Sequence, residues 1–107
     1  MFSKKSNLGY KEILQGVSFK TTTWGSKTLM SEFRLKKGSK IPLHQHPYEQ
    51  TGYLISGKMK FTIGKEHFSA EPGDSWNLPS NVEHGVEVLE DTLVVEVFSP
   101  VREDYLP

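Results

Sequence analysis

The stretch GSKIPLHQHPYEQTGYLISG, residues 38–57, contains two histidines two positions apart between flanking glycines. On a β-strand this spacing puts the His44 and His46 imidazoles on one face, about 6.6 Å apart along the backbone, so that both can approach one ion. If the chain stays extended beyond His46, Gln50 falls on the same face and Glu49 on the opposite face. The stretch therefore predicts a strand that presents two imidazoles and one amide to a metal, although an isolated pair of this kind is more often a surface pair.

A third histidine ends the stretch GDSWNLPSNVEH, residues 73–84. Gly73 and Pro79 frame a short strand here, and Asn81 occupies a position where a turn would require a positive φ. His84 then opens an apolar strand face, where a buried imidazole needs a polar partner. We expect it to join the histidine pair and Gln50 at one metal. His67 has no polar partner in phase with it and is expected to be an ordinary strand histidine.

Glycines and prolines interrupt the rest of the chain at short intervals, which leaves no room for an amphipathic helix of ordinary length. The segments between them alternate between apolar and polar residues, the period of a half-buried strand. An acidic turn at Glu90-Asp91 is expected to separate the last two strands. Many short strands without covering helices indicate one antiparallel sandwich or barrel domain over residues 1–107. The expected strands are Lys27–Lys36, Gln50–Ser56, Lys58–Ile63, Lys65–Ala70, Ser75–Leu78, His84–Glu90 and Thr92–Phe98.

Composition excludes several classes of protein. The 107 residues include 13 basic and 13 acidic side chains, so the charge balance lacks the basic excess that nucleic-acid binding needs. No cysteine is present, which excludes disulfides, thiolate metal sites and thiol catalysis. No apolar run is long enough to span a bilayer, and the first residues lack the features of a signal peptide. A cytoplasmic protein without a nucleic-acid or membrane partner is the simplest expectation.

The strand expected over Thr92–Phe98 is mostly apolar on both faces, because Leu93, Val95 and Val97 alternate with Val94, Glu96 and Phe98. Without helices to cover the second face, packing of this sheet against a second copy is a reasonable hypothesis. We therefore predict a homodimer.

Together these residues resemble the cupin family. Its first motif, G-x5-H-x-H-x3,4-E-x6-G, matches Gly38, His44, His46 and Gly57, with Gln50 in the position of the glutamate. Its second motif, G-x5-P-x-G-x2-H-x3-N, matches Gly73, Pro79 and His84, with Asn81 for the glycine and Val88 for the asparagine. The resemblance implies an all-β fold, a single cupin jelly-roll (double-stranded β-helix) barrel, and a divalent transition metal held by His44, His46, Gln50 and His84. Imidazole-rich sites accept Zn, Ni, Fe, Mn or Cu, so the metal is not identified.

The C-terminal segment EVFSPVREDYL, residues 96–106, is similar to the KdgF-type pectin-degradation cupins, which convert 4,5-unsaturated uronates to linear keto acids. In that family an acidic residue, a phenylalanine and an arginine act beside the metal, and they correspond here to Glu96, Phe98 and Arg102. The resemblance implies an isomerase of carbohydrate metabolism in which Glu96 moves a proton and Arg102, with Phe98, binds a sugar acid. The family usually has aspartate in place of Glu96.

Other readings stay open. Glu96 could accept hydrogen bonds from tyrosines of the barrel, and Arg102 could pin the tail or a dimer partner. Trp24, Tyr53 and Trp76 are candidates for sugar stacking, although core packing is commoner for such residues. The alternative functions are a non-haem oxygenase or isomerase of another kind, which Gln50 disfavours because it supplies neither a carboxylate nor an imidazole, and a non-catalytic sugar-binding module.

Overall fold

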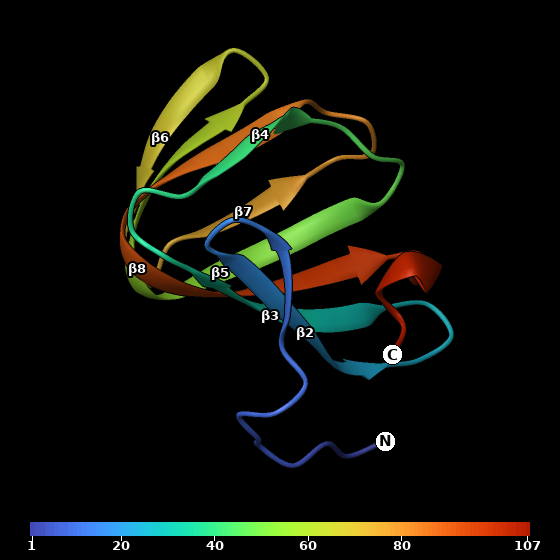
Figure 1. The fold of residues 1–107 in the computed structure, drawn as a ribbon. Coiled ribbons are helices and arrows are strands. Elements are labelled where there is room, and N and C mark those ends of the chain that lie inside the picture. The colour runs from blue at the N-terminus through green and yellow to red at the C-terminus, as the bar shows by residue number, and fades with distance from the viewer.

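The computed structural model describes residues 1–107 and consists almost entirely of antiparallel strands (Figure 1). One short 3-10 helix, η1, lies near the C-terminus. The elements in chain order are β1 (Lys11–Leu14), β2 (Val17–Trp24), β3 (Leu29–Leu35), β4 (Lys40–His44), β5 (Glu49–Ile63), β6 (Glu66–Ala70), β7 (Ser75–Leu78), β8 (His84–Ser99) and η1 (Glu103–Tyr105). The expected all-β architecture is confirmed.

The strands form one sheet that folds over into two facing layers. Its order is β1-β2-β3-β8-β5-β6, with β4 on β8 and β7 on β5. The long strands β5 and β8 pair with each other along almost their whole length. One half of β8 pairs with β3 and the other half with β4, so the two long strands pass from one layer to the other. Figure 1 shows the result: β2 and β3 lie across from β4 and β6.

The fold-over is built into β5 and β8. Their register shifts three times between Leu54 and Met59, which bends both strands. Gly57 sits at this bend with φ of 99°, and a Cβ there would lie 2.3 Å from the Asp91 carbonyl oxygen. A residue without a side chain is therefore required where the two strands cross.

The sequence predicted that one strand ends and another begins at Gly57, and again at Glu90-Asp91. Both predictions are wrong, because β5 and β8 continue through these positions. Turn-forming residues mark a bend in both cases, and cross-strand hydrogen bonds keep the chain extended beyond it. Two strands, β1 and β2, were also not foreseen, because their sequences lack sustained alternation. The strand expected to carry both His44 and His46 is β4, which is mostly exposed, contains a proline and ends at His44.

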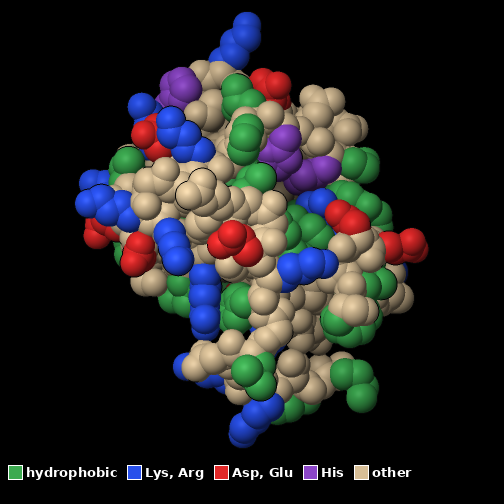
Figure 2. All heavy atoms as spheres, viewed as in Figure 1, with side chains coloured by type: hydrophobic (Ala, Val, Ile, Leu, Met, Phe, Trp, Pro, Cys, Tyr) green, Lys and Arg blue, Asp and Glu red, His purple; other side chains and the backbone are tan.

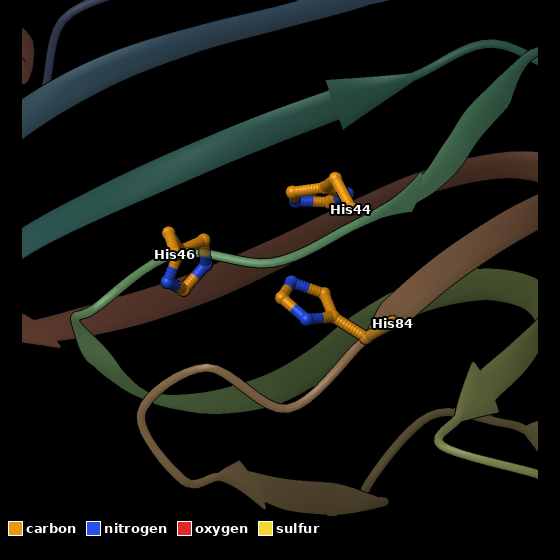
Figure 3. A group of neighbouring side chains, drawn as sticks. All are labelled: His44, His46 and His84. Carbon is orange, nitrogen blue, oxygen red and sulfur yellow. The ribbon is translucent and has the colours of Figure 1, made fainter.

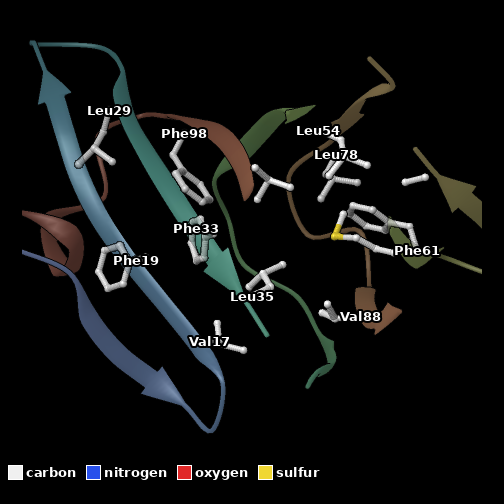
Figure 4. Close-up of a cluster of buried hydrophobic side chains, with 13 residues drawn as sticks. Val17, Phe19, Leu29, Phe33, Leu35, Leu54, Phe61, Leu78, Val88 and Phe98 are labelled. Atoms are coloured by element: carbon white, nitrogen blue, oxygen red, sulfur yellow. The ribbon is translucent and has the colours of Figure 1, made fainter. Parts of the chain in front are cut away.

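The core fills the space between the two layers (Figure 4). It consists of the alternate side chains of each strand that point inward, as in β3, where Leu29, Phe33 and Leu35 are buried. Thirteen buried apolar residues form one continuous cluster. Three of the buried polar side chains, Gln50, His84 and Glu96, line one cavity together with members of this cluster.

The outer face of β8 carries the half-buried side chains Leu93, Val95 and Val97, beside the exposed Met30 and Tyr53 of neighbouring strands. The apolar outer face from which we predicted a homodimer is therefore present. Association of two copies stays a prediction, which light scattering at micromolar concentration would test. No helix in the structure has the length and apolar character needed to cross a membrane.

Candidate metal centre

Three histidines from distant parts of the chain converge at one end of the barrel. His44 ends β4, His46 follows in the connection to β5, and His84 begins β8. One ring nitrogen of each lies within 4.8 Å of those of the other two. Their rings face one another in Figure 3, and Figure 2 shows histidine side chains adjoining at the surface. The two residues of the H-x-H pair do not share a regular strand, because β4 ends at His44 and the chain bends before β5.

Backbone contacts orient each imidazole. The Nδ1 atom of every ring lies 2.8–3.0 Å from a carbonyl oxygen of the residue two positions away. A carbonyl oxygen only accepts hydrogen bonds, so the neutral rings carry their proton on Nδ1 and keep a lone pair on Nε2. The partners are Pro42 for His44, Tyr48 for His46 and Val82 for His84. This backbone support for the ring nitrogen opposite the ligand atom is typical of metal-binding histidines.

Gln50 completes the donor set, which suits a cation. Its Oε1 atom lies 2.9 Å from Nε2 of His46. Because the Nδ1 proton of His46 is directed at Tyr48, both of these atoms present lone pairs and would repel each other. Two ligand atoms about 2.1 Å from one ion and at right angles to each other are about 3 Å apart. The donors that the structure brings together therefore fit a divalent metal held by three nitrogens and one amide oxygen.

The other side of Gln50 contacts a buried carboxyl. The Gln50 side chain hydrogen-bonds Glu96, and with Oε1 directed at His46 its amide NH2 is the donor. Trp76 Nε1 also donates to Glu96, at 3.1 Å from Oε1 and 3.3 Å from Oε2. Glu96 is 5% exposed, and burial raises its pKa to about 8 against the lowering effect of these two hydrogen bonds. The hydrogen-bond partners of Glu96 are thus a tryptophan and an amide, and not the barrel tyrosines that the alternative interpretation of Glu96 supposed.

Burial also keeps two of the imidazoles neutral. It lowers the pKa of His46 and lowers that of His84 to about 4. These rings are therefore able to bind a metal at pH values where a free histidine, with a pKa near 6.5, carries a proton.

Arg102 lies just beyond β8, next to the histidines. Its Nε and Nη2 atoms donate to the two carboxylate oxygens of Asp104, at 3.2 and 2.8 Å. The guanidinium carbon lies 3.8 Å from the ring centre of Tyr105 and 4.9 Å from those of Tyr48 and Phe98. Arg102 thus does pair within the tail, as the structural alternative supposed, while its side chain also borders the cavity described next.

A cavity of about 380 Å³ connects these groups. The residues named as site candidates from the sequence all line it: His44, His46, Gln50, His84, Glu96, Phe98 and Arg102. Most of the remaining wall is apolar, from residues such as Phe33, Met59 and Val94. Phe98 is almost fully buried and stands edge-on to His46 at 5.9 Å between ring centres.

None of the aromatic residues considered for sugar stacking lines this cavity. Trp24 and Tyr53 are exposed on other surfaces, and Trp76 lies behind Glu96. Tyr105 borders the cavity but was not foreseen as a site residue, nor was the contact between Asp104 and Arg102. The one available signal was the run of Arg102, Asp104 and Tyr105 within the C-terminal segment that carries the family resemblance.

Comparison with known proteins agrees with this fold. A family model described as a cupin domain matches residues 31–100. The pectin degradation protein KdgF of Dickeya dadantii (strain 3937) is 29% identical over 99 residues, which cover 91% of this chain and 90% of that protein. The structure of KdgF from Halomonas sp. superposes with a TM-score of 0.93 at 27% identity and covers 99% of this chain and 98% of that one. An RmlC-like cupin from Shewanella frigidimarina gives a TM-score of 0.92 at 23% identity over 98% of this chain and 95% of its own. The matched region spans both histidine segments and most of the barrel, and the chain belongs to the cupin family.

Proposed function

We propose that this chain is a metal-dependent enzyme, one cupin domain over residues 1–107, that converts a 4,5-unsaturated uronate to its linear keto acid in the breakdown of pectin or a related polyuronate. One observation carries the proposal: a buried carboxyl, Glu96, and a guanidinium, Arg102, line the same cavity as the three converging histidines and Gln50. The similarity to a pectin degradation protein along nearly the whole chain supports the same substrate class.

The Nε2 atoms of His44, His46 and His84 and the Oε1 atom of Gln50 would hold a divalent transition metal, Zn, Ni, Fe, Mn or Cu. Such an ion supplies Lewis acidity toward substrate oxygen atoms. All four ligands are neutral, so they leave its double charge uncompensated. An anionic substrate with carboxylate and hydroxyl oxygens is the chemical class that suits this centre.

Ring opening of such a uronate is an isomerisation that relocates one proton. The hydroxyl on C1 loses its proton to a base, the bond between C1 and the ring oxygen breaks as the C1 aldehyde forms, and the ring oxygen is left as an enolate on C5. Delivery of the same proton to C4 then converts the enolate to a ketone. The reaction needs no oxidant or reductant, and it needs one group that gives and takes a proton near the substrate.

Glu96 is suited to that role. Burial raises its pKa to about 8, so its carboxyl is mostly protonated near neutral pH. A pKa this close to the working pH allows one group both to take up and to release a proton. Trp76 Nε1 and the Gln50 amide fix its orientation. In this proposal the ionised form of Glu96, which is in equilibrium with the protonated form near neutral pH, takes the C1 hydroxyl proton and then delivers it to C4.

Arg102 supplies the positively charged hydrogen-bond donors for the substrate carboxylate. Guanidinium groups bind carboxylates through paired N–H donors. The Phe98 ring packs against the guanidinium and forms part of the apolar wall of the cavity next to it. The acid group of the uronate would thus lie at Arg102, with the reacting carbons between that group and Glu96.

The proposal is tested by incubating metal-loaded protein with unsaturated galacturonate and following the loss of its conjugated ultraviolet absorbance. We expect turnover that Glu96→Gln and His44→Ala abolish. His67→Ala is the matched control, because His67 is exposed and bonds only Thr62 on the neighbouring strand. No acceleration over buffer would refute the assignment, and binding without turnover would favour a sugar-binding module.

A further inference from the structure

We propose that Asp104 is a positioning residue, which holds the Arg102 guanidinium so that its unpaired Nη1 end serves the cavity as a receptor for the substrate carboxylate. The inference rests on the proposed function, because it assigns the cavity a substrate that carries an acid group. It concerns a residue outside the motifs that define the metal centre.

The guanidinium offers donors on two edges, and Asp104 uses only one of them. Nε and Nη2 form the side edge, and both donate to the Asp104 carboxylate. Nη1 makes no hydrogen bond within the protein. Arg102 lines the cavity together with His46 and Glu96. A second carboxylate can therefore bind at the Nη1 and Nη2 end while Asp104 keeps its place.

Aromatic rings restrict the plane of the same guanidinium. Tyr105 lies 3.8 Å from the guanidinium carbon, and Tyr48 and Phe98 approach it at 4.9 Å. The Arg102 side chain is only 14% exposed. Packing against rings limits tilting, but rotation within the plane is controlled by the in-plane bonds to Asp104. Together, the aromatic packing and the hydrogen bonds to Asp104 define one orientation of the Arg102 guanidinium.

Asp104 itself is held by the barrel. It lies in η1, where the Tyr105 backbone N–H donates to the Arg102 carbonyl oxygen at 3.0 Å. The Thr21 hydroxyl donates to the Tyr105 carbonyl, and the Tyr105 ring packs on Phe19 with 4.3 Å between ring centres. These contacts tie the C-terminal segment to β2. Asp104 therefore has a stable reference for orienting Arg102, although its own side chain is more than half exposed.

The test compares Asp104→Asn, Asp104→Glu and the control Glu103→Gln in two assays. Glu103 is the adjacent acid of η1, is exposed, and its side chain makes no hydrogen bond. The first assay is turnover of unsaturated galacturonate by zinc-loaded protein. The second is calorimetric binding of D-galacturonate, with D-galactose as the neutral comparison. Thermal unfolding of each variant confirms that it is folded.

We expect Asp104→Asn to raise KM and the Kd for galacturonate about fivefold to tenfold, with kcat changed less than twofold. Galactose binding and the Glu103→Gln variant should be unaffected, and Asp104→Glu should recover part of the loss. In an Arg102→Lys background, Asp104→Asn should have little further effect, because lysine has no fork to orient.

Unchanged or lower KM and Kd in Asp104→Asn would overturn the inference; a decrease would show that Asp104 competes with the substrate. If Asp104→Asn instead lowers both kcat and thermal stability, Asp104 has a structural role, and this result would also overturn the inference. If the wild-type protein binds galacturonate without turnover, the proposed reaction fails while the binding assay still decides the role of Asp104. A wild-type protein that binds no sugar acid would overturn both.

Discussion

Gly52→Ala is the substitution for which the structure predicts the largest effect from a single added methyl group. A Cβ at Gly52 would lie 2.1 Å from Trp76 Nε1 and 2.4 Å from Glu96 Oε2. Ordinary contacts between non-bonded heavy atoms are about 3.5 Å or longer, so the neighbours would have to move by more than about 1 Å. Neither is the end of a flexible side chain on the surface.

Trp76 cannot retreat without breaking contacts. Its Nε1 atom donates to Glu96 at 3.1 Å, and its ring packs on Phe61 with 5.0 Å between ring centres. Overpacking in a core costs about 1–3 kcal/mol, and loss of a hydrogen bond to a buried group adds about 1–3 kcal/mol. We expect Gly52→Ala to lower the free energy of unfolding by about 2–6 kcal/mol, or the Tm by roughly 10–30 °C.

Urea unfolding of the metal-free protein, followed by tryptophan fluorescence, measures the change. Gly25→Ala is the matched control, because a Cβ at Gly25 meets no atom within 4 Å and its φ is not positive. Trp76→Phe removes the indole nitrogen that the new methyl group would strike. The double variant should therefore be more stable than the sum of the two single changes predicts.

A Gly52→Ala protein within about 0.5 kcal/mol of Gly25→Ala would refute the reasoning, since it would mean that Trp76 and Glu96 adjust freely. Additive effects in the double variant would do the same. In either case the contact between the indole and the carboxyl would not be the constraint that places Glu96 beside the cavity.

Two further predictions concern the metal centre. His84→Ala should weaken zinc binding about 100-fold or more in a competition assay with a chromophoric chelator, because one of four ligands is lost, whereas His67→Ala should bind zinc like the wild type. In chelator-treated protein, Glu96 keeps its proton when folded, with a pKa of about 8, but loses it near 4.5 when unfolded. It therefore stabilises the fold below about pH 4.5, and this contribution is lost as the pH rises to 8. Glu96→Gln should remove that part of the pH dependence in urea unfolding; parallel wild-type and variant profiles between pH 5 and 8 would contradict it.

The candidate ligands could be read from the sequence because the information is local. Gln50 is buried and Glu49 is exposed, as alternation within β5 requires, although the chain bends after β4 and does not run extended from His46 to Gln50 as expected. The frame of Gly73 and Pro79 indicated the strand that precedes His84, and Asn81 has the positive φ of 66° that its position predicts. These features depend on residues a few positions apart, where side-chain period and backbone sterics decide.

The contacts around the ligands could not be read in this way. Trp76 reaches Glu96 because β7 and β8 pair with opposite edges of β5, and neither the 20-residue separation nor the residue types indicate that pairing. The expected turn at Glu90-Asp91 failed for a related reason, since the pairing of two long strands carries the chain through a bend that looks like a turn.

The sequence by itself therefore determined the strand periodicity, the family resemblance and the nitrogen and oxygen donor types of the candidate metal centre. Only the tertiary structure decided that Glu96 is buried between Gln50 and Trp76, and that one edge of the Arg102 guanidinium hydrogen-bonds Asp104 while Nη1 stays unpaired. The physical reason is that alternation follows from the geometry of one strand, whereas burial, pKa and the direction of a side chain depend on residues that folding brings together from distant strands.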